Sequence, residues 1–89
     1  MVYKLKDGFI VRKIGDQIMA VPVGKQTSEI HGMIALTESA ELLWNALVTG
    51  AREIELVKII TDVYDIDEQK AAEDVHKFLE GLREQGALL

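Results

Sequence analysis

The sequence predicts an α+β domain, in which a three-stranded antiparallel sheet is followed by a three-helix bundle. Two observations support this class. Residues 9–36 contain three short runs of apolar and β-branched side chains, which are typical of strands. Residues 37–89 instead repeat apolar side chains every three or four positions, which is typical of helices packed on a core. Because 89 residues leave room for one core, we expect a single domain over residues 1–89.

The first two strands are predicted to form a tight hairpin. Residues 9–14 and 18–21 are its two apolar runs, and Gly15-Asp16 between them is a two-residue loop that tolerates positive φ angles. Pro22 lacks a backbone N–H, so it should close the second strand. Residues 24–29 are polar without periodicity and predict a loop. The third strand is then expected over residues 30–36.

Helical periodicity begins directly after the third strand. Thr37 is a suitable N-cap for the first helix, because its hydroxyl can accept a hydrogen bond from the backbone of the next turn. This helix should bury Trp44 and end at Gly50, which supplies the left-handed residue of a C-terminus. A second helix is expected from residue 53 to about residue 64.

A third helix is predicted in the last quarter of the chain. Asp67 is its expected N-cap, and Gly86 should end it. Leu88 and Leu89 are expected to fold back as an apolar tail. A sheet followed by three helices has the elements of a winged-helix domain with its sheet placed first in the chain.

Composition and charge exclude several classes of protein. The chain has no cysteine, which removes disulfides, thiolate metal sites and thiol nucleophiles. No apolar run is long enough to span a membrane and the N-terminus lacks the segment of a secretory signal, so we expect a cytoplasmic protein without a membrane partner. Residues 1–25 carry a net charge of +3 and the remaining residues −8. The acidic helical half disfavours nucleic acid as a partner.

The sequence predicts no catalytic residue, cofactor or metal. His31 and His76 fall in different elements, whereas a metal site needs several converging ligands. Ser28 and Ser39 do not lie in the Gly-x-Ser-x-Gly turn of a serine nucleophile. The glycines are scattered at turns and helix ends, so they form no phosphate-binding loop.

The free edge of the third strand is the main candidate for function. In a three-stranded meander this strand pairs on one side only, and its open edge can accept an extended peptide by strand addition. The alternative, equally compatible with the residues, is that the third helix covers this edge and prevents aggregation. Gly81, Asp74 and Lys77 on that helix favour a groove over a sealed contact. His31 is either an exposed strand end or a polar contact to a bound ligand.

The order and spacing of these residues resemble the PqqD family. The similarity extends from about residue 7 to residue 89. Two departures are Thr37, where the family commonly has asparagine, and Ala87, where the family runs directly from glycine to leucines. The residues that carry the resemblance upstream are Phe9 to Arg12, Gly15-Asp16 and Val21 to Gly24. Those downstream are Leu36-Thr37, Ala40, Trp44, Leu47, Gly50, Tyr64-Asp65, Asp74-Val75, Phe78-Leu79, Leu82 and Gly86 to Leu89.

This resemblance implies a non-enzymatic peptide chaperone. PqqD is the small protein of pyrroloquinoline quinone biosynthesis, and its relatives recognise the leader peptides of ribosomally made, modified peptides. The implied partners are a precursor leader peptide and a peptide-modifying enzyme, often of the radical S-adenosylmethionine type. The leader would lie as an added strand against the third strand, flanked by the third helix. The implied binding residues are His31, Gly32, Met33, Ile34, Ala35, Leu36, Asp74, Lys77, Phe78 and Gly81.

Two other hypotheses compete with peptide recognition. The first is a winged-helix module with a DNA-binding or regulatory function. The expected recognition helix carries six acidic and three basic residues from Asp67 to Glu84, which is the wrong sign for a DNA groove. The second is a homodimer formed through the free strand edge.

Overall fold

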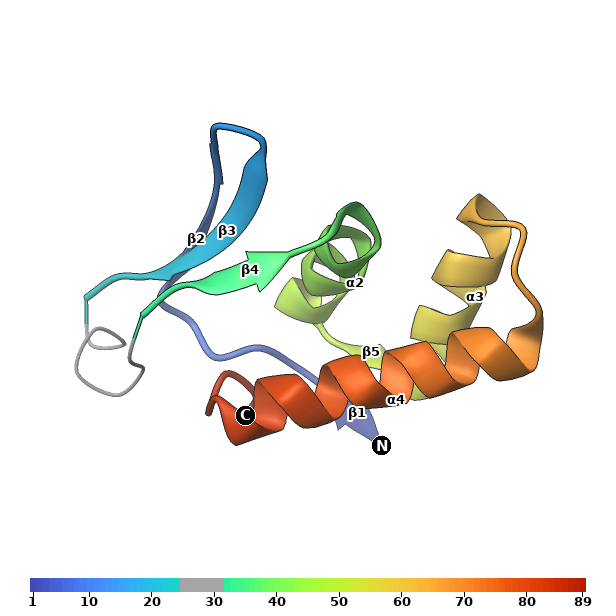
Figure 1. Ribbon diagram of the computed structural model, residues 1–89. Coiled ribbons are helices and arrows are strands. Elements are labelled where there is room, and N and C mark those ends of the chain that lie inside the picture. The colour runs from blue at the N-terminus through green and yellow to red at the C-terminus, as the bar shows by residue number, and fades with distance from the viewer. Residues whose placement is uncertain (25–31) are drawn as a thin grey trace.

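The computed structural model describes residues 1–24 and 32–89. A β-hairpin forms the first two strands of its main sheet (Figure 1). The two strands are β2 (Phe9–Ile14) and β3 (Gln17–Pro22), as the sequence predicts. They are antiparallel, with Ile14 paired to Gln17 across the turn. Gly15 has a φ of +62°, which glycine adopts without a steric cost. Pro22 is the last residue of β3, which confirms its expected place.

The third strand of this sheet is shorter than predicted. It is β4 (Ile34–Leu36), which pairs antiparallel with β3, so the strand order is β2-β3-β4. The expected strand over residues 30–36 is therefore wrong at Gly32 and Met33, which precede β4. Gly32 has a φ of +85°, far from extended geometry, so the ladder begins only after it. Residues 25–31, which include most of the predicted loop, lie outside the described part of the chain.

The three helices follow in the predicted places, and their capping residues explain where they begin. The Thr37 hydroxyl accepts a hydrogen bond from the Ala40 N–H at 3.1 Å, and the Asp67 carboxylate accepts one from the Lys70 N–H at 2.8 Å. Each bond satisfies a backbone donor that the first turn of a helix leaves unpaired. The helices are α2 (Glu38–Thr49), α3 (Glu53–Val63) and α4 (Glu68–Glu84).

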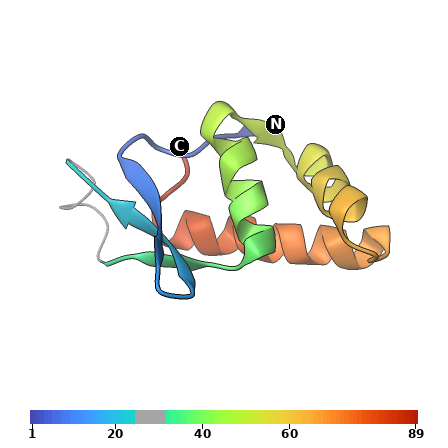
Figure 2. The same ribbon diagram turned by 90° about the horizontal axis from the view of Figure 1, so that it is seen from above.

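One hydrophobic core joins the sheet to the helices. Trp44 of α2 is only 2% exposed, and its ring meets that of Phe9 edge-on, with centroids 5.2 Å apart. Ile34 and Leu36 of β4 are buried in the same core as Val75 of α4. In Figure 2 the start of α2 lies over the middle of α4, and α3 lies beside the first part of α4. The α+β class and the buried Trp44 are thereby confirmed.

The N-terminal segment forms a second, smaller set of pairings that the sequence does not predict. Strand β1 (Val2–Tyr3) pairs with β5 (Ala51–Arg52), which lies between α2 and α3. Leu5 bridges to Leu88, and the Lys6 N–H donates to the Ala87 carbonyl at 2.8 Å. The expected return of the apolar tail is confirmed: Leu88 packs against the core, and the Leu89 N–H donates to the Lys4 carbonyl at 2.9 Å, although the Leu89 side chain is 81% exposed.

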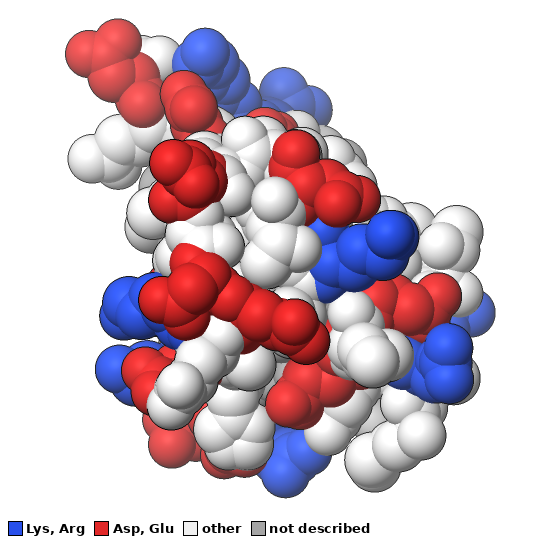
Figure 3. Space-filling model, turned by 90° about the vertical axis from the view of Figure 1, so that its right-hand side faces the viewer, with Lys and Arg blue, Asp and Glu red and all other residues white. Residues whose placement is uncertain are grey.

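Charge is unevenly distributed over the folded surface. Figure 3 shows the side of the molecule that carries α3 and the start of α4, where acidic side chains gather with fewer basic ones among them. Such a surface is unfavourable for a phosphate backbone. Among the residues that the structure describes, no helix combines the length and the apolar character needed to cross a membrane.

Candidate functional site

The outer edge of β4 has no partner strand in the described part of the chain. β4 pairs with β3 alone and is the last strand of its sheet. In Figure 1 β4 lies below β3 and above α4. An edge strand presents alternate backbone N–H and C=O groups that another strand can pair with. This edge is the first element of the candidate site.

The side chains of β4 alternate between the core and the solvent. Ile34 and Leu36 are buried, at 6% and 7% exposure, while Ala35 between them is exposed. The predicted contribution of Ile34 and Leu36 to binding is therefore limited to their backbone groups, since their side chains belong to the core. Ala35 and the exposed Met33 are the side chains at this strand that solvent reaches.

A pocket of about 230 Å³ lies beside the end of β4. Its apolar floor includes Leu43 of α2, Ile60 of α3 and Phe78 of α4, so all three helices build it. Thr37, which directly follows β4, and Asp74 contribute polar groups. The pocket has the mixed character of a ligand site, with apolar walls and a few polar groups at the rim.

Two of the four predicted positions on α4 line this pocket. Asp74 and Phe78 are one helical turn apart, so they share the side of α4 that faces the start of α2. The Asp74 carboxylate accepts a hydrogen bond from Lys70 at 3.1 Å, and this bond raises the pKa of the Lys70 ammonium above its ordinary value. Asp74 is thus held at the rim of the pocket by its neighbour on the helix.

The other two positions on α4 lie outside the pocket lining. Gly81 follows Phe78 on the same side of the helix and is half-buried. No atom outside its immediate chain surroundings comes within 4 Å of an ideal Cβ built on it, so space remains beside the helix there. Lys77 is exposed and forms no ion pair with any described residue. His31 lies outside the described residues.

The sequence did not indicate several residues of the pocket as binding candidates. Thr37 was expected as a helix cap only, yet it also lines the pocket together with Ser39, whose hydroxyl lies 3.1 Å from that of Thr37. Ala40, Leu43 and Ile60 read as core positions, because helical spacing alone does not separate the floor of a pocket from a sealed core. Their role follows from how three helices meet, which no local pattern encodes.

The described residues bring together no set of groups for metal chemistry. No three His, Cys, Asp or Glu residues in these parts of the chain are arranged to hold a metal ion. His76 lies 3.8 Å from both Glu53 and Glu80, but all three are surface side chains at the contact between α3 and α4.

Comparison with solved structures identifies proteins of the same fold. One match is TbiB1, solved in complex with the TbiA(beta) leader peptide, with a TM-score of 0.74 and 22% identity over 96% of this chain and 93% of that one. Another is a lasso peptide synthetase B1 complexed with its leader peptide, with a TM-score of 0.75 and 18% identity over 98% of this chain and 96% of that one. At such identities the likeness establishes the fold.

Comparison with sequence families gives a more direct assignment. A search among curated proteins found no match. The family model described as coenzyme PQQ synthesis protein D (PqqD) matches residues 21–88, which is well over half of the chain. The match leaves out β2 and most of β3, although the likeness to the solved structures spans them. The chain therefore belongs to the PqqD family.

Proposed function

We propose that this protein binds the leader segment of a ribosomally made precursor peptide and presents it to a peptide-modifying enzyme, such as one of the radical S-adenosylmethionine type. The leader lies as an added strand along the outer edge of β4, and α4 flanks it. Two observations carry this proposal: β4 has one edge without a partner strand among the described residues, and Thr37, the residue after β4, lines an open pocket. Membership of the PqqD family and two structural neighbours that hold leader peptides support it.

β4 is too short for backbone pairing alone to supply the affinity of leader binding. A strand of three residues offers a partner two or three hydrogen bonds, each with a net value of about 1 kcal/mol. Micromolar binding needs about 8 kcal/mol. Most of the affinity must then come from leader side chains, and the pocket lined by Leu43, Ile60 and Phe78 can bury one apolar side chain. Pairing aligns the leader, and the pocket selects it.

The first test locates the bound leader. The probe is a synthetic leader from a short precursor peptide encoded beside the gene of this chain. In a titration followed by backbone amide resonances, we expect the largest shifts at residues 33–36 and around Asp74 and Phe78. Binding that leaves residues 33–36 unperturbed would contradict strand addition and leave leader recognition standing. No binding of such a leader at micromolar concentrations would contradict the function itself.

A matched pair of α4 variants tests the flank of the groove. Gly81→Leu adds a bulky side chain to the side of α4 that carries Asp74 and Phe78, whereas Glu73→Leu adds the same side chain to an exposed position of the same helix. Leucine is a strong helix former, so both variants should fold, as circular dichroism will check. We expect Gly81→Leu to weaken leader binding at least tenfold and Glu73→Leu to change it less than twofold.

A further inference from the structure

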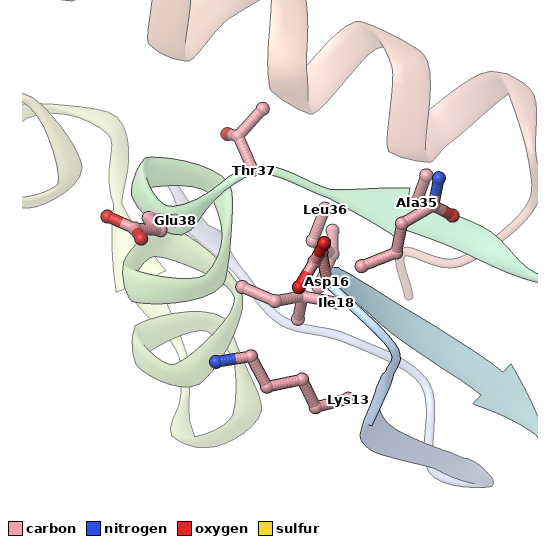
Figure 4. A pocket seen from close by; sticks show the side chains of 8 residues that line it. Lys13, Asp16, Ile18, Ala35, Leu36, Thr37 and Glu38 are labelled. Atoms are coloured by element: carbon pink, nitrogen blue, oxygen red, sulfur yellow. The ribbon is translucent and has the colours of Figure 1, made fainter.

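A second and larger pocket opens at the same end of β4, between the tip of the β2–β3 hairpin and the start of α2 (Figure 4). Its volume is about 530 Å³, more than twice that of the pocket beside α4. The half-buried Ile18 of β3 contributes apolar surface to it, and Leu36 of β4, which pairs with Ile18 across the sheet, also lines it. Nothing in the proposed pairing of a leader with β4 uses this pocket.

Two uncompensated charges lie on the hairpin side of this pocket. Lys13 and Asp16 both line it, and neither forms an ion pair with another residue in the described parts of the chain. In Figure 4 the Lys13 side chain extends from the hairpin towards α2, and Asp16 lies above it beside Ile18. A hydrogen-bond donor, an acceptor and an apolar surface together suit a peptide, which offers carbonyl groups, N–H groups and side chains.

The two pockets meet at the end of β4. Thr37 lines both of them, and Leu36, the last residue of β4, lines the larger one. A strand added to β4 would lie about 4.8 Å from it. Because β4 has only three residues, a longer peptide on its edge extends past at least one end of the strand, and at Leu36 the chain turns away at Thr37 into α2. The larger pocket lies at that point.

We propose that this pocket is a second subsite for the same leader, which binds the residues that continue beyond the stretch paired with β4. The segment it takes is an extended peptide with an apolar side chain placed on Ile18 and backbone groups within reach of Lys13 and Asp16. This inference rests on the proposed leader-binding function. It adds that the hairpin, which lies largely outside the family match, takes part in recognition.

Adjacent residues of β2 supply a matched pair of variants. Lys13 lines the pocket, whereas Arg12 projects from the opposite face of the sheet because neighbouring strand residues alternate. Both are exposed cations, so Lys13→Glu and Arg12→Glu change the net charge equally. The probe is the same synthetic leader, from the precursor peptide encoded beside the gene of this chain. We expect Lys13→Glu to weaken its binding about fivefold, as for the loss of one exposed charge-assisted hydrogen bond. Arg12→Glu should weaken it less than twofold.

Shortening the leader by three residues, from each end in turn, completes the test. One of the two truncated leaders should bind the wild-type protein about tenfold more weakly than the full leader does. The same truncation should weaken binding to Lys13→Glu less than twofold, because the groups in contact with Lys13 have already lost their partner. Equal effects of the two glutamate variants, or truncations that act alike on wild type and Lys13→Glu, would overturn the second subsite. Leader binding with shifts at residues 33–36 but none at Lys13, Asp16 and Ile18 would overturn it too. These outcomes leave the proposed function intact, whereas a wild type that binds no leader overturns both.

Discussion

Single glycines in this protein have opposite effects, depending on what surrounds their missing Cβ. Gly50 ends α2 with a φ of +108°, and a Cβ there would come within 3.2 Å of Val2 in strand β1. Gly81 lies inside α4 with helical geometry and open space around it. The first glycine is needed for the fold. The second lowers helix stability, and its retention is consistent with the groove proposed beside it.

Alanine substitutions at these two positions should therefore change stability in opposite directions. We expect Gly50→Ala to lower the free energy of unfolding by about 1–2 kcal/mol, because alanine is strained at this φ and crowds Val2. Gly81→Ala should raise it by about 0.5–1 kcal/mol through helix propensity. Urea unfolding followed by the fluorescence of the buried Trp44 measures both. A destabilised Gly81→Ala would show that the space beside α4 is filled in solution.

At the level of elements, the start of α4 depends on one carboxylate. Asp67 accepts a hydrogen bond from the Lys70 N–H, while the Lys70 ammonium binds Asp74 one turn further on. The pKa of Lys70 is raised above the ordinary 10.5 by its hydrogen bond to Asp74, so on the basic side this ion pair is lost as the pH rises through that raised value. Cap and ion pair together order the first half of α4, which carries Asp74 into the candidate site.

Removal of the cap should destabilise the domain without a change in its core. We expect Asp67→Ala to lower the free energy of unfolding by about 1 kcal/mol, which corresponds to a melting temperature lower by about 4–8 °C in a domain of this size. Asp67→Asn keeps an acceptor at the N-cap and should retain most of the stability. Asp65→Ala, an exposed change in the same connection, is the control and should stay within about 0.5 kcal/mol. Equal melting temperatures for Asp67→Ala and the wild type would contradict the capping role.

An element was predictable from the sequence where the interactions that define it join residues close together in the chain. The helices begin at Thr37 and Asp67, whose side chains bond to residues three positions away, so the signal is local. β4 starts later than its apolar run suggests because Gly32 has a left-handed φ, which sequence does not specify for a glycine. The pocket beside β4 needs Leu43, Ile60 and Phe78 from three separate helices. The place of β4 at the end of the sheet was predictable, but the pocket was not.

On the scale of the whole molecule, the N-terminal segment holds together parts that are distant in sequence. The Leu5 N–H donates to Leu47 at the end of α2, and the Leu89 N–H donates to Lys4. Strands of two residues have no periodicity, and a bridge from Leu5 to Leu88 spans nearly the whole chain, so no local pattern indicates either. These pairings tie the end of α2 and the tail after α4 to one segment, which fixes the helices around the sheet.

Leu5 is the side chain on which this segment depends, since it is 4% exposed and packs in the main core. We expect Leu5→Ala to lower the free energy of unfolding by about 2–4 kcal/mol, through lost burial and the cavity left behind. Val2 belongs to the same segment but is 64% exposed. Val2→Ala should therefore lower the free energy of unfolding by less than about 0.5 kcal/mol. The Lys6 N–H donates to Ala87 and the Leu89 N–H donates to Lys4, so hydrogen exchange of these two amides should accelerate together in Leu5→Ala, because both tails lose their shared pairing. Faster exchange at Lys6 alone, with Leu89 still protected, would show that the C-terminal tail is held by α4 and not by the N-terminal segment.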